Sequence, residues 1–122
     1  MKITVSEYCY DNSNKVFYEL YMVNNECVLG RLKLNDSHSK CKVMGMKGML
    51  LEIMNIDVKY VRKGIGGKLI KAGEKMMKKR GMDYSLLYCL KDSWMEKWYI
   101  RLGYKYYMEH DEKNNWYYKM LK

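Results

Sequence analysis

Apolar residues in the first half of the chain are grouped in short stretches that predict β-strands. The stretches 16–23 and 27–34 are both mostly apolar, and the polar residues 24–26 separate them. Two such stretches joined by so short a polar segment predict an antiparallel hairpin. Further short strands are expected near residues 1–10 and 40–44.

The run from Leu50 to Val58 differs from these stretches because most of its positions are apolar. A continuous apolar run of this length is typical of a central strand that is buried on both faces of a sheet. Glu52 and Asn55 interrupt the run, and polar side chains in a buried strand need a structural or functional reason.

A helix is expected next, because apolar residues recur with the helical period. They are Ile65, Leu69, Ala72 and Met76. Lysines flank these positions, as on the exposed side of an amphipathic helix. Gly81 predicts the end of the helix near residue 80, and residues 83–90 form another candidate strand.

The last part of the chain predicts a short helix and two strands. Ser93 and Glu96 have the spacing of a capping box, and Gly103 predicts the end of the helix that they begin. Two aromatic-rich stretches around a polar turn, 104–108 and 116–121, are expected to be strands. This order of elements predicts an α/β or α+β layer arrangement.

Length and composition favour one compact domain over residues 1–122. No run approaches the roughly 20 apolar residues that a membrane span needs, and the first residues lack the apolar segment of a signal peptide. We therefore expect a soluble, intracellular, cytoplasmic protein with no membrane partner.

Cysteine spacing and net charge limit the candidate cofactors and partners. The four cysteines are far apart, and the chain has only two histidines, so no metal site is predicted and the cysteines are expected to be reduced. The net charge of +9 would attract an anionic cofactor, a nucleic acid or an acidic protein. The charge does not choose among these three.

The segment from Arg62 to Lys68 contains three glycines and joins the buried strand to the helix. The first N–H groups of a helix and the positive end of its dipole form a site for phosphate oxygens, and glycines let the backbone approach the anion. Two nucleotide-binding motifs do not fit. A P-loop would need serine or threonine at Leu69, and a dinucleotide fingerprint would need its third glycine there.

Residues 61–66, Val-Arg-Lys-Gly-Ile-Gly, resemble the pyrophosphate loop of the GNAT superfamily of N-acetyltransferases, whose pattern is Q/R-x-x-G-x-G/A. One position departs from the pattern: Val61 stands where glutamine or arginine is usual, and the arginine is displaced to Arg62. The later segment from Asp92 to Tyr104 is similar to the family pattern N-x-x-A-x-x-F-Y-x-x-x-G-F. Its Tyr99 lies four residues before Gly103, as the family tyrosine does.

The resemblance implies a GNAT-like α/β (α+β) fold with a mixed sheet of about six or seven strands. In that fold acetyl-CoA lies in a V-shaped gap between two parallel strands, here 50–58 and 83–90. The first strand would bind the pantetheine arm, and the glycine turn would bind the pyrophosphate. The residues assigned to cofactor binding are Ile56, Asp57, Val58, Arg62, Lys63, Gly64, Ile65, Gly66, Gly67, Lys68, Asp92 and Tyr99.

The resemblance also suggests two catalytic residues. Tyr99 is the candidate proton donor to the departing thiolate. Glu52 lies six residues before Val58, the spacing of the catalytic glutamate in histone-acetylating members, and is the candidate base. Strand alternation places Glu52 on the same face as Val58. His110 falls in a polar turn and is expected to be solvated.

The family usually has a helix pair after its first strand, and this chain is expected to lack it. An acceptor site that is open on that side favours a lysine or terminal amine of a protein or another macromolecule. Two alternatives stay open. One is a small-amine acetyltransferase, as a monomer or a homodimer, and the other is a non-catalytic basic module that binds nucleic acid or an acidic protein.

Overall fold

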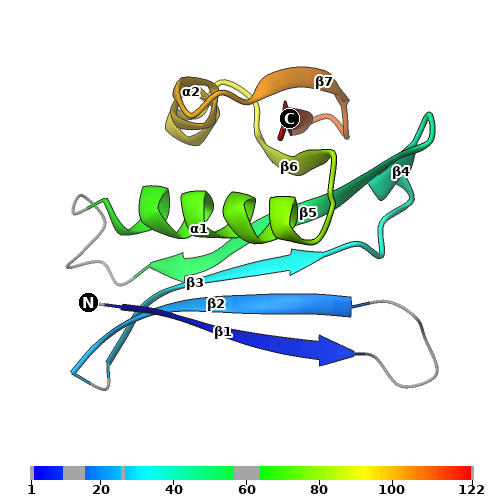
Figure 1. Ribbon diagram of the computed structural model, residues 1–122. Helices are drawn as coiled ribbons and strands as arrows, with labels where there is room; N and C mark the ends of the chain where they lie inside the picture. Colours follow the sequence, from blue (N-terminus) through cyan, green and yellow to red (C-terminus); the bar gives the residue numbers. More distant parts are fainter. Residues whose placement is uncertain (1, 10–15, 26, 57–63, 122) are drawn as a thin grey trace.

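The computed structural model describes residues 2–9, 16–25, 27–56 and 64–121 (Figure 1). The elements in chain order are β1 (Lys2–Cys9), β2 (Val16–Asn24), β3 (Cys27–Asn35), a 3-10 turn (Ser39–Cys41), β4 (Lys42–Val43), β5 (Met46–Ile56), α1 (Ile65–Lys79), β6 (Tyr84–Leu90), α2 (Trp94–Arg101), β7 (Lys105–Glu109) and β8 (Asn114–Met120). Seven strands form one sheet in the order β1-β2-β3-β5-β6-β8-β7, and β4 pairs with the start of β5. The mixed α+β fold and the size of the sheet are therefore as predicted.

The first strands form an antiparallel meander. β2 and β3 make the predicted hairpin, and Asn25 in its turn has the positive φ of 48° that asparagine tolerates. β5 begins at Met46, earlier than expected. The strand expected at 40–44 is mostly the 3-10 turn and the two-residue β4, because Met44 and Gly45 take positive φ angles and turn the chain back into β5.

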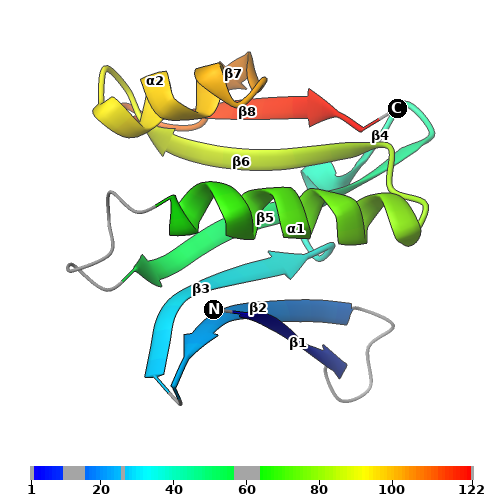
Figure 2. The ribbon, with the colours of Figure 1, turned by 60° about the vertical axis from the view of Figure 1, so that its left-hand side comes forward.

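Both α-helices lie on one face of the sheet, which we call the helix face (Figures 1 and 2). Leu69 and Met77 of α1 are buried in the same apolar core as Leu32 of β3 and Tyr99 of α2. At Gly73 a side chain would collide with Leu32, so this glycine lets α1 approach the sheet closely.

The opposite face, which we call the open face, carries a smaller core. Its buried members are Cys41, Leu50, Tyr84, Leu86 and Trp116. Within the described residues, neither α-helix lies on this face. Residues 36–41, which we call the strap, cover part of it instead: the Tyr84 hydroxyl donates to the Lys40 carbonyl, and the His38 ring packs on Trp116.

The strands β5 and β6 are parallel neighbours for only part of their length. Their pairing ends at Leu50 with Leu86, whereas β5 continues to Ile56 and β6 to Leu90. Beyond this point the two strands separate, toward the end of the sheet where α1 begins (Figure 2). The predicted V-shaped gap is therefore present between the two predicted strands.

Candidate functional site

Tyr99 of α2 lies on the helix face beside the gap. Its side chain is 3% exposed and packs against the rings of Trp98 and Tyr104, with centroid distances of 5.1 and 5.8 Å. Burial, and to a smaller extent the nearby Cys89 thiol, raise the pKa of the Tyr99 hydroxyl. The hydroxyl therefore keeps its proton at neutral pH and could serve as a proton donor but not as a base.

Cys89 of β6 also lies on the helix face of the gap, and it is buried. Burial, with a smaller contribution from Glu96, raises the pKa of its thiol to about 11. Since the thiolate is the nucleophilic form of cysteine, this side chain is poorly suited to accept an acyl group.

The start of α2 is capped as the sequence predicts. The Glu96 N–H donates to the Ser93 hydroxyl oxygen at 3.2 Å, and the Ser93 hydroxyl donates to the Leu90 carbonyl at 2.7 Å. Asp92, just before this cap, is exposed and has a positive φ of 55°. The Tyr117 hydroxyl of β8 donates to the Glu96 carboxylate, which fixes α2 against the sheet.

The glycine turn places the N-terminus of α1 at the open end of the gap (Figure 2). Gly64 is the cap residue with φ 76°, and the first helical hydrogen bond runs from the Lys68 N–H to the Gly64 carbonyl at 3.1 Å. The N–H groups of Ile65, Gly66 and Gly67 are thus not used within the helix. A Cβ atom at Gly67 would meet no described atom within 4 Å, so there is room for a ligand beside this turn.

Several other predicted cofactor residues cannot be compared with the structure. Asp57, Val58, Arg62 and Lys63 lie outside the described residues, and Ile56 is the last residue of β5. Lys68 is exposed on the first turn of α1.

Glu52 of β5 lies on the open face, because it alternates with Leu51, which is buried under α1. It is half-buried, and its direct cross-strand partner on β3 is Lys33. The register of β3 and β5 shifts so that Met54 is an extra residue in β5. Strand alternation from Glu52 to Val58 is therefore interrupted by this bulge, and the expected common face does not follow.

Four aromatic or imidazole rings gather on the open face where β6 leaves β5. We call them the ring cluster: His38 and His110 each lie 4.9 Å from Trp116 between centroids, and Tyr88 lies 5.1 Å from Trp116 and 4.9 Å from His110. His110 is exposed, as expected for a residue of this turn, and its ring also packs against Tyr88 and Trp116. No sequence signal identifies this cluster, since it depends on the β6–β8 register and on the strap.

The surroundings of His38 favour its neutral form. Its Nδ1 accepts a hydrogen bond from the Lys40 N–H at 3.0 Å. Burial lowers the pKa of His38, and the charges of Lys40 and His110 lower it further.

A buried polar network ties α1 to the strands behind the gap. The Tyr104 hydroxyl donates to Glu74 at 3.0 Å and lies 2.7 Å from the Ser85 hydroxyl. Lys119 donates to Glu74 at 3.1 Å and to the Leu102 carbonyl, at the end of α2, at 2.9 Å. Because each group has a partner, the network fixes the position of α2 relative to α1.

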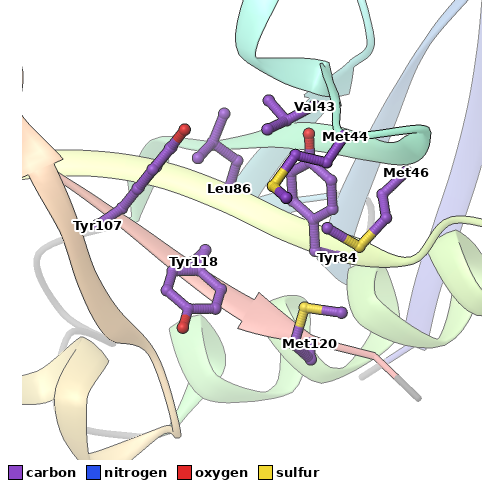
Figure 3. A pocket seen from close by; sticks show the side chains of 8 residues that line it. All are labelled: Val43, Met44, Met46, Tyr84, Leu86, Tyr107, Tyr118 and Met120. Carbon is purple, nitrogen blue, oxygen red and sulfur yellow. The ribbon is translucent and has the colours of Figure 1, made fainter.

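An apolar pocket of about 340 Å³ lies on the open face at the other end of β6, away from the gap (Figure 3). Tyrosine, methionine and aliphatic side chains line it. They are Val43, Met44, Met46, Tyr84, Leu86, Tyr107, Tyr118 and Met120. The strap contacts both Tyr84, which lines this pocket, and Trp116, which belongs to the ring cluster.

A metal site and a membrane-spanning helix each have requirements that can be compared with the structure. Among the described residues, no three His, Cys, Asp or Glu side chains are grouped so as to hold a metal ion. No helix in the described part of the chain is both long and apolar enough to cross a membrane.

The structure is similar as a whole to the solved structures of several acetyltransferases. The PaiA N-acetyltransferase from Thermoplasma acidophilum, in complex with coenzyme A, has a TM-score of 0.67 and 21% identity over 89% of this chain. A GNAT-family acetyltransferase from Staphylococcus aureus has a TM-score of 0.65 and 22% identity over 93% of this chain and 72% of its own. The chain has the GNAT acetyltransferase fold.

The solved acetyltransferases differ from this chain in length to different degrees. The chain spans 62% of the length of the PaiA enzyme. The IAA acetyltransferase from Bacillus cereus is similar over 98% of this chain and 99% of its own, with a TM-score of 0.68 and 14% identity. No protein-family model matches the sequence, and no curated protein is similar to it in sequence.

This version of the GNAT fold is short because β1 and β2 are joined only by residues 10–15. Their pairing extends to Cys9 and Val16. So short a connection leaves no length for a helix pair, since an average helix alone has about 11 residues. The first strand of the sheet is β1, so the connection between β1 and β2 is where the usual helix pair is lacking.

Proposed function

We propose that the protein is an N-acetyltransferase that moves the acetyl group of acetyl-CoA to a primary amine. One observation carries this proposal. In a GNAT fold, β5 and β6 separate next to the N-terminus of α1, and the buried hydroxyl of Tyr99, which keeps its proton, lies beside the same gap. The complex of the PaiA N-acetyltransferase with coenzyme A, which has the same fold, supports this assignment of the donor.

The gap can hold the cofactor in an extended form. Beyond Leu50, β5 has no pairing with β6, so its backbone groups near Ile56, Asp57 and Val58 can bind the pantetheine amides as an added strand would. The N–H groups of residues 64–67 then receive the pyrophosphate. Arg62, Lys63 and Lys68 supply positive charge, and Asp92 borders the cofactor at the start of α2.

The reaction proceeds by direct attack of the amine on the thioester carbonyl. The C–N bond forms, and as the tetrahedral intermediate collapses the C–S bond breaks and Tyr99 gives its proton to the thiolate, while the new amide nitrogen loses its extra proton and Tyr99 is reprotonated from solvent. The raised pKa of Tyr99 suits this role because the hydroxyl is protonated before the step. Glu52 lies on the opposite face of the sheet, where its carboxylate can hold the acceptor ammonium or take its proton.

A thermal-shift titration with acetyl-CoA tests the donor site. Ligand at one hundred times its dissociation constant should add about 2.7 kcal/mol to the free energy of unfolding. The variant Gly67→Asp should lose this shift, because it puts a negative charge where the pyrophosphate binds, while the free protein still folds. Lys79→Gln makes the same change of net charge at the far end of α1 and should keep the shift. A wild-type protein that shows no shift contradicts the proposal.

For the acceptor we propose a lysine or terminal amine of a macromolecule. The open face carries no α-helix within the described residues, so a protein segment has access to the gap. Incubation with labelled acetyl-CoA and host lysate should place the label in the protein fraction. Label in small molecules favours the small-amine alternative, and salt-sensitive retention on nucleic acid without any cofactor shift favours the non-catalytic module.

A further inference from the structure

The two faces of the gap differ in how far their side chains are exposed to solvent. On the helix face, Leu87 and Cys89 of β6 and Tyr99 of α2 are buried in the main core. On the open face, the alternating residues Tyr88 and Leu90 are 43% and 53% exposed. Within the described residues, an acceptor therefore reaches the thioester from the open face.

On this face His110 is separated from the edge of the gap by one side chain, the ring of Tyr88. Tyr88 lies two residues beyond Leu86, the last residue of β6 that pairs with β5. The His110 ring packs on Tyr88 at 4.9 Å and leaves part of its own surface exposed. An imidazole at this position can exchange protons with solvent and with a group that enters the gap.

The two imidazoles of the ring cluster have different environments. In His38, Nδ1 is already bonded to the Lys40 N–H, and burial lowers the pKa of the ring. His110 instead has its Nε2 3.8 Å from a carboxylate oxygen of Asp111. Hydrogen bonds from the N–H groups of Lys113 and Asn114 help to lower the pKa of Asp111, so this carboxylate is charged and can stabilise an imidazolium.

We propose that His110, paired with Asp111, takes the proton that the acceptor ammonium loses on the open face of the gap. The N–H bond of the ammonium breaks, and the new N–H bond forms on the His110 imidazole. The neutral amine then attacks the thioester, and the imidazolium later returns the proton to solvent. Glu52, on the β5 side, holds the positive charge of the ammonium. This inference rests on the proposed acetyl transfer.

Bromoacetyl-CoA tests the position of His110 directly, because it carries an electrophilic carbon where the acetyl methyl group lies. The imidazole nitrogen should displace bromide: a C–N bond forms, the C–Br bond breaks, and one proton leaves. We expect mass spectrometry of peptides to find the label on His110, and excess coenzyme A should prevent it. The test uses the full chain with Cys27→Ser, since Cys27 is an exposed thiol.

Matched variants make the result decisive. His38→Gln should keep the label, because it removes the other imidazole of the ring cluster, and His110→Gln should lose the label but keep the thermal shift with acetyl-CoA. Label that goes to Glu52, Cys89 or His38, or no label despite a thermal shift, overturns the inference. A missing thermal shift in the wild-type chain instead contradicts the proposed function itself.

The rate of labelling tests the pairing with Asp111. The His110 Nε2 lies 3.8 Å from a carboxylate oxygen of Asp111. Asp111→Asn should slow the labelling of His110, because it removes the negative charge that stabilises the positive charge formed on the imidazole during the reaction. An equal labelling rate in Asp111→Asn and in the wild type overturns the pairing.

Discussion

Polar side chains on the helix face and on the open face of the sheet have different surroundings. On the helix face, Glu74, Tyr104 and Lys119 are bonded to one another and shielded under α1. On the open face, His110 and Tyr88 are packed side by side but stay partly exposed. The comparison teaches that stability is expected mainly from the helix face, whereas His110, the proposed base, lies on the open face with part of its ring exposed.

The largest effect is expected from a cavity in the helix-face core. Leu69→Ala removes a fully buried side chain of α1 and should lower the free energy of unfolding by about 3 to 4 kcal/mol. Leu90→Ala makes the same chemical change at an exposed position and should cost less than about 0.5 kcal/mol. Urea denaturation of both variants measures the difference, and equal losses would refute the assignment of stability to the helix face.

The buried polar network should give the next largest effect. Glu74→Ala leaves Lys119 without its ion-pair partner and Tyr104 without its acceptor, which should cost about 2 kcal/mol. Glu112→Ala removes an exposed carboxylate and is the control, with no measurable change expected. If urea denaturation finds both variants as stable as the wild type, the network is not a source of stability.

The strap should contribute less than the network. Tyr84→Phe removes only the hydroxyl that donates to the Lys40 carbonyl, with an expected cost of about 1 kcal/mol. Tyr107→Phe alters a partly exposed hydroxyl at the same pocket and should be neutral. A loss in Tyr107→Phe that equals the loss in Tyr84→Phe would show that the strap is not held by this bond.

The smallest effect concerns the pH dependence of stability. Because burial lowers the pKa of His38 in the folded chain, the unfolded chain binds its proton more readily. Stability from this group is present above the usual imidazole pKa of about 6.5 and is lost as the pH falls through the lower folded value. Urea denaturation at pH 7.5 and 5.5 should show a smaller acid loss in His38→Gln than in the wild type. An identical loss contradicts the role of His38.

Much of the fold could be predicted from residue patterns. The period of Ile65, Leu69, Ala72 and Met76 was enough to predict α1, and the Ser93–Glu96 capping box predicted the start of α2. The gap, in contrast, came from the resemblance to the GNAT superfamily. Propensity alone cannot show where two parallel strands stop pairing, because this depends on the packing of distant residues.

The features that were missed depend on cross-strand register. The extra residue at Met54 appears only when β5 is aligned with β3, and the ring cluster only when Tyr88 is aligned with Trp116. The strap overlaps the strand expected near residues 40–44, yet His38 and Cys41 within it pack against rings and apolar side chains far along the chain. Contacts between residues so far apart in the chain cannot be predicted from the local sequence.

The short pairing between β5 and β6 also has a consequence for how the chain folds. Within the described residues, the meander of β1, β2, β3 and β5 is paired with the strands β6, β8 and β7 through three residue pairs, which are Gly48–Tyr84, Met49–Ser85 and Leu50–Leu86. Each group of antiparallel neighbours can form from local contacts, whereas this seam requires α1 to have crossed between them. We expect the seam to be the last part of the sheet to form, so that pulsed hydrogen exchange during refolding protects the Leu50 and Leu86 amides after those of the β2–β3 hairpin.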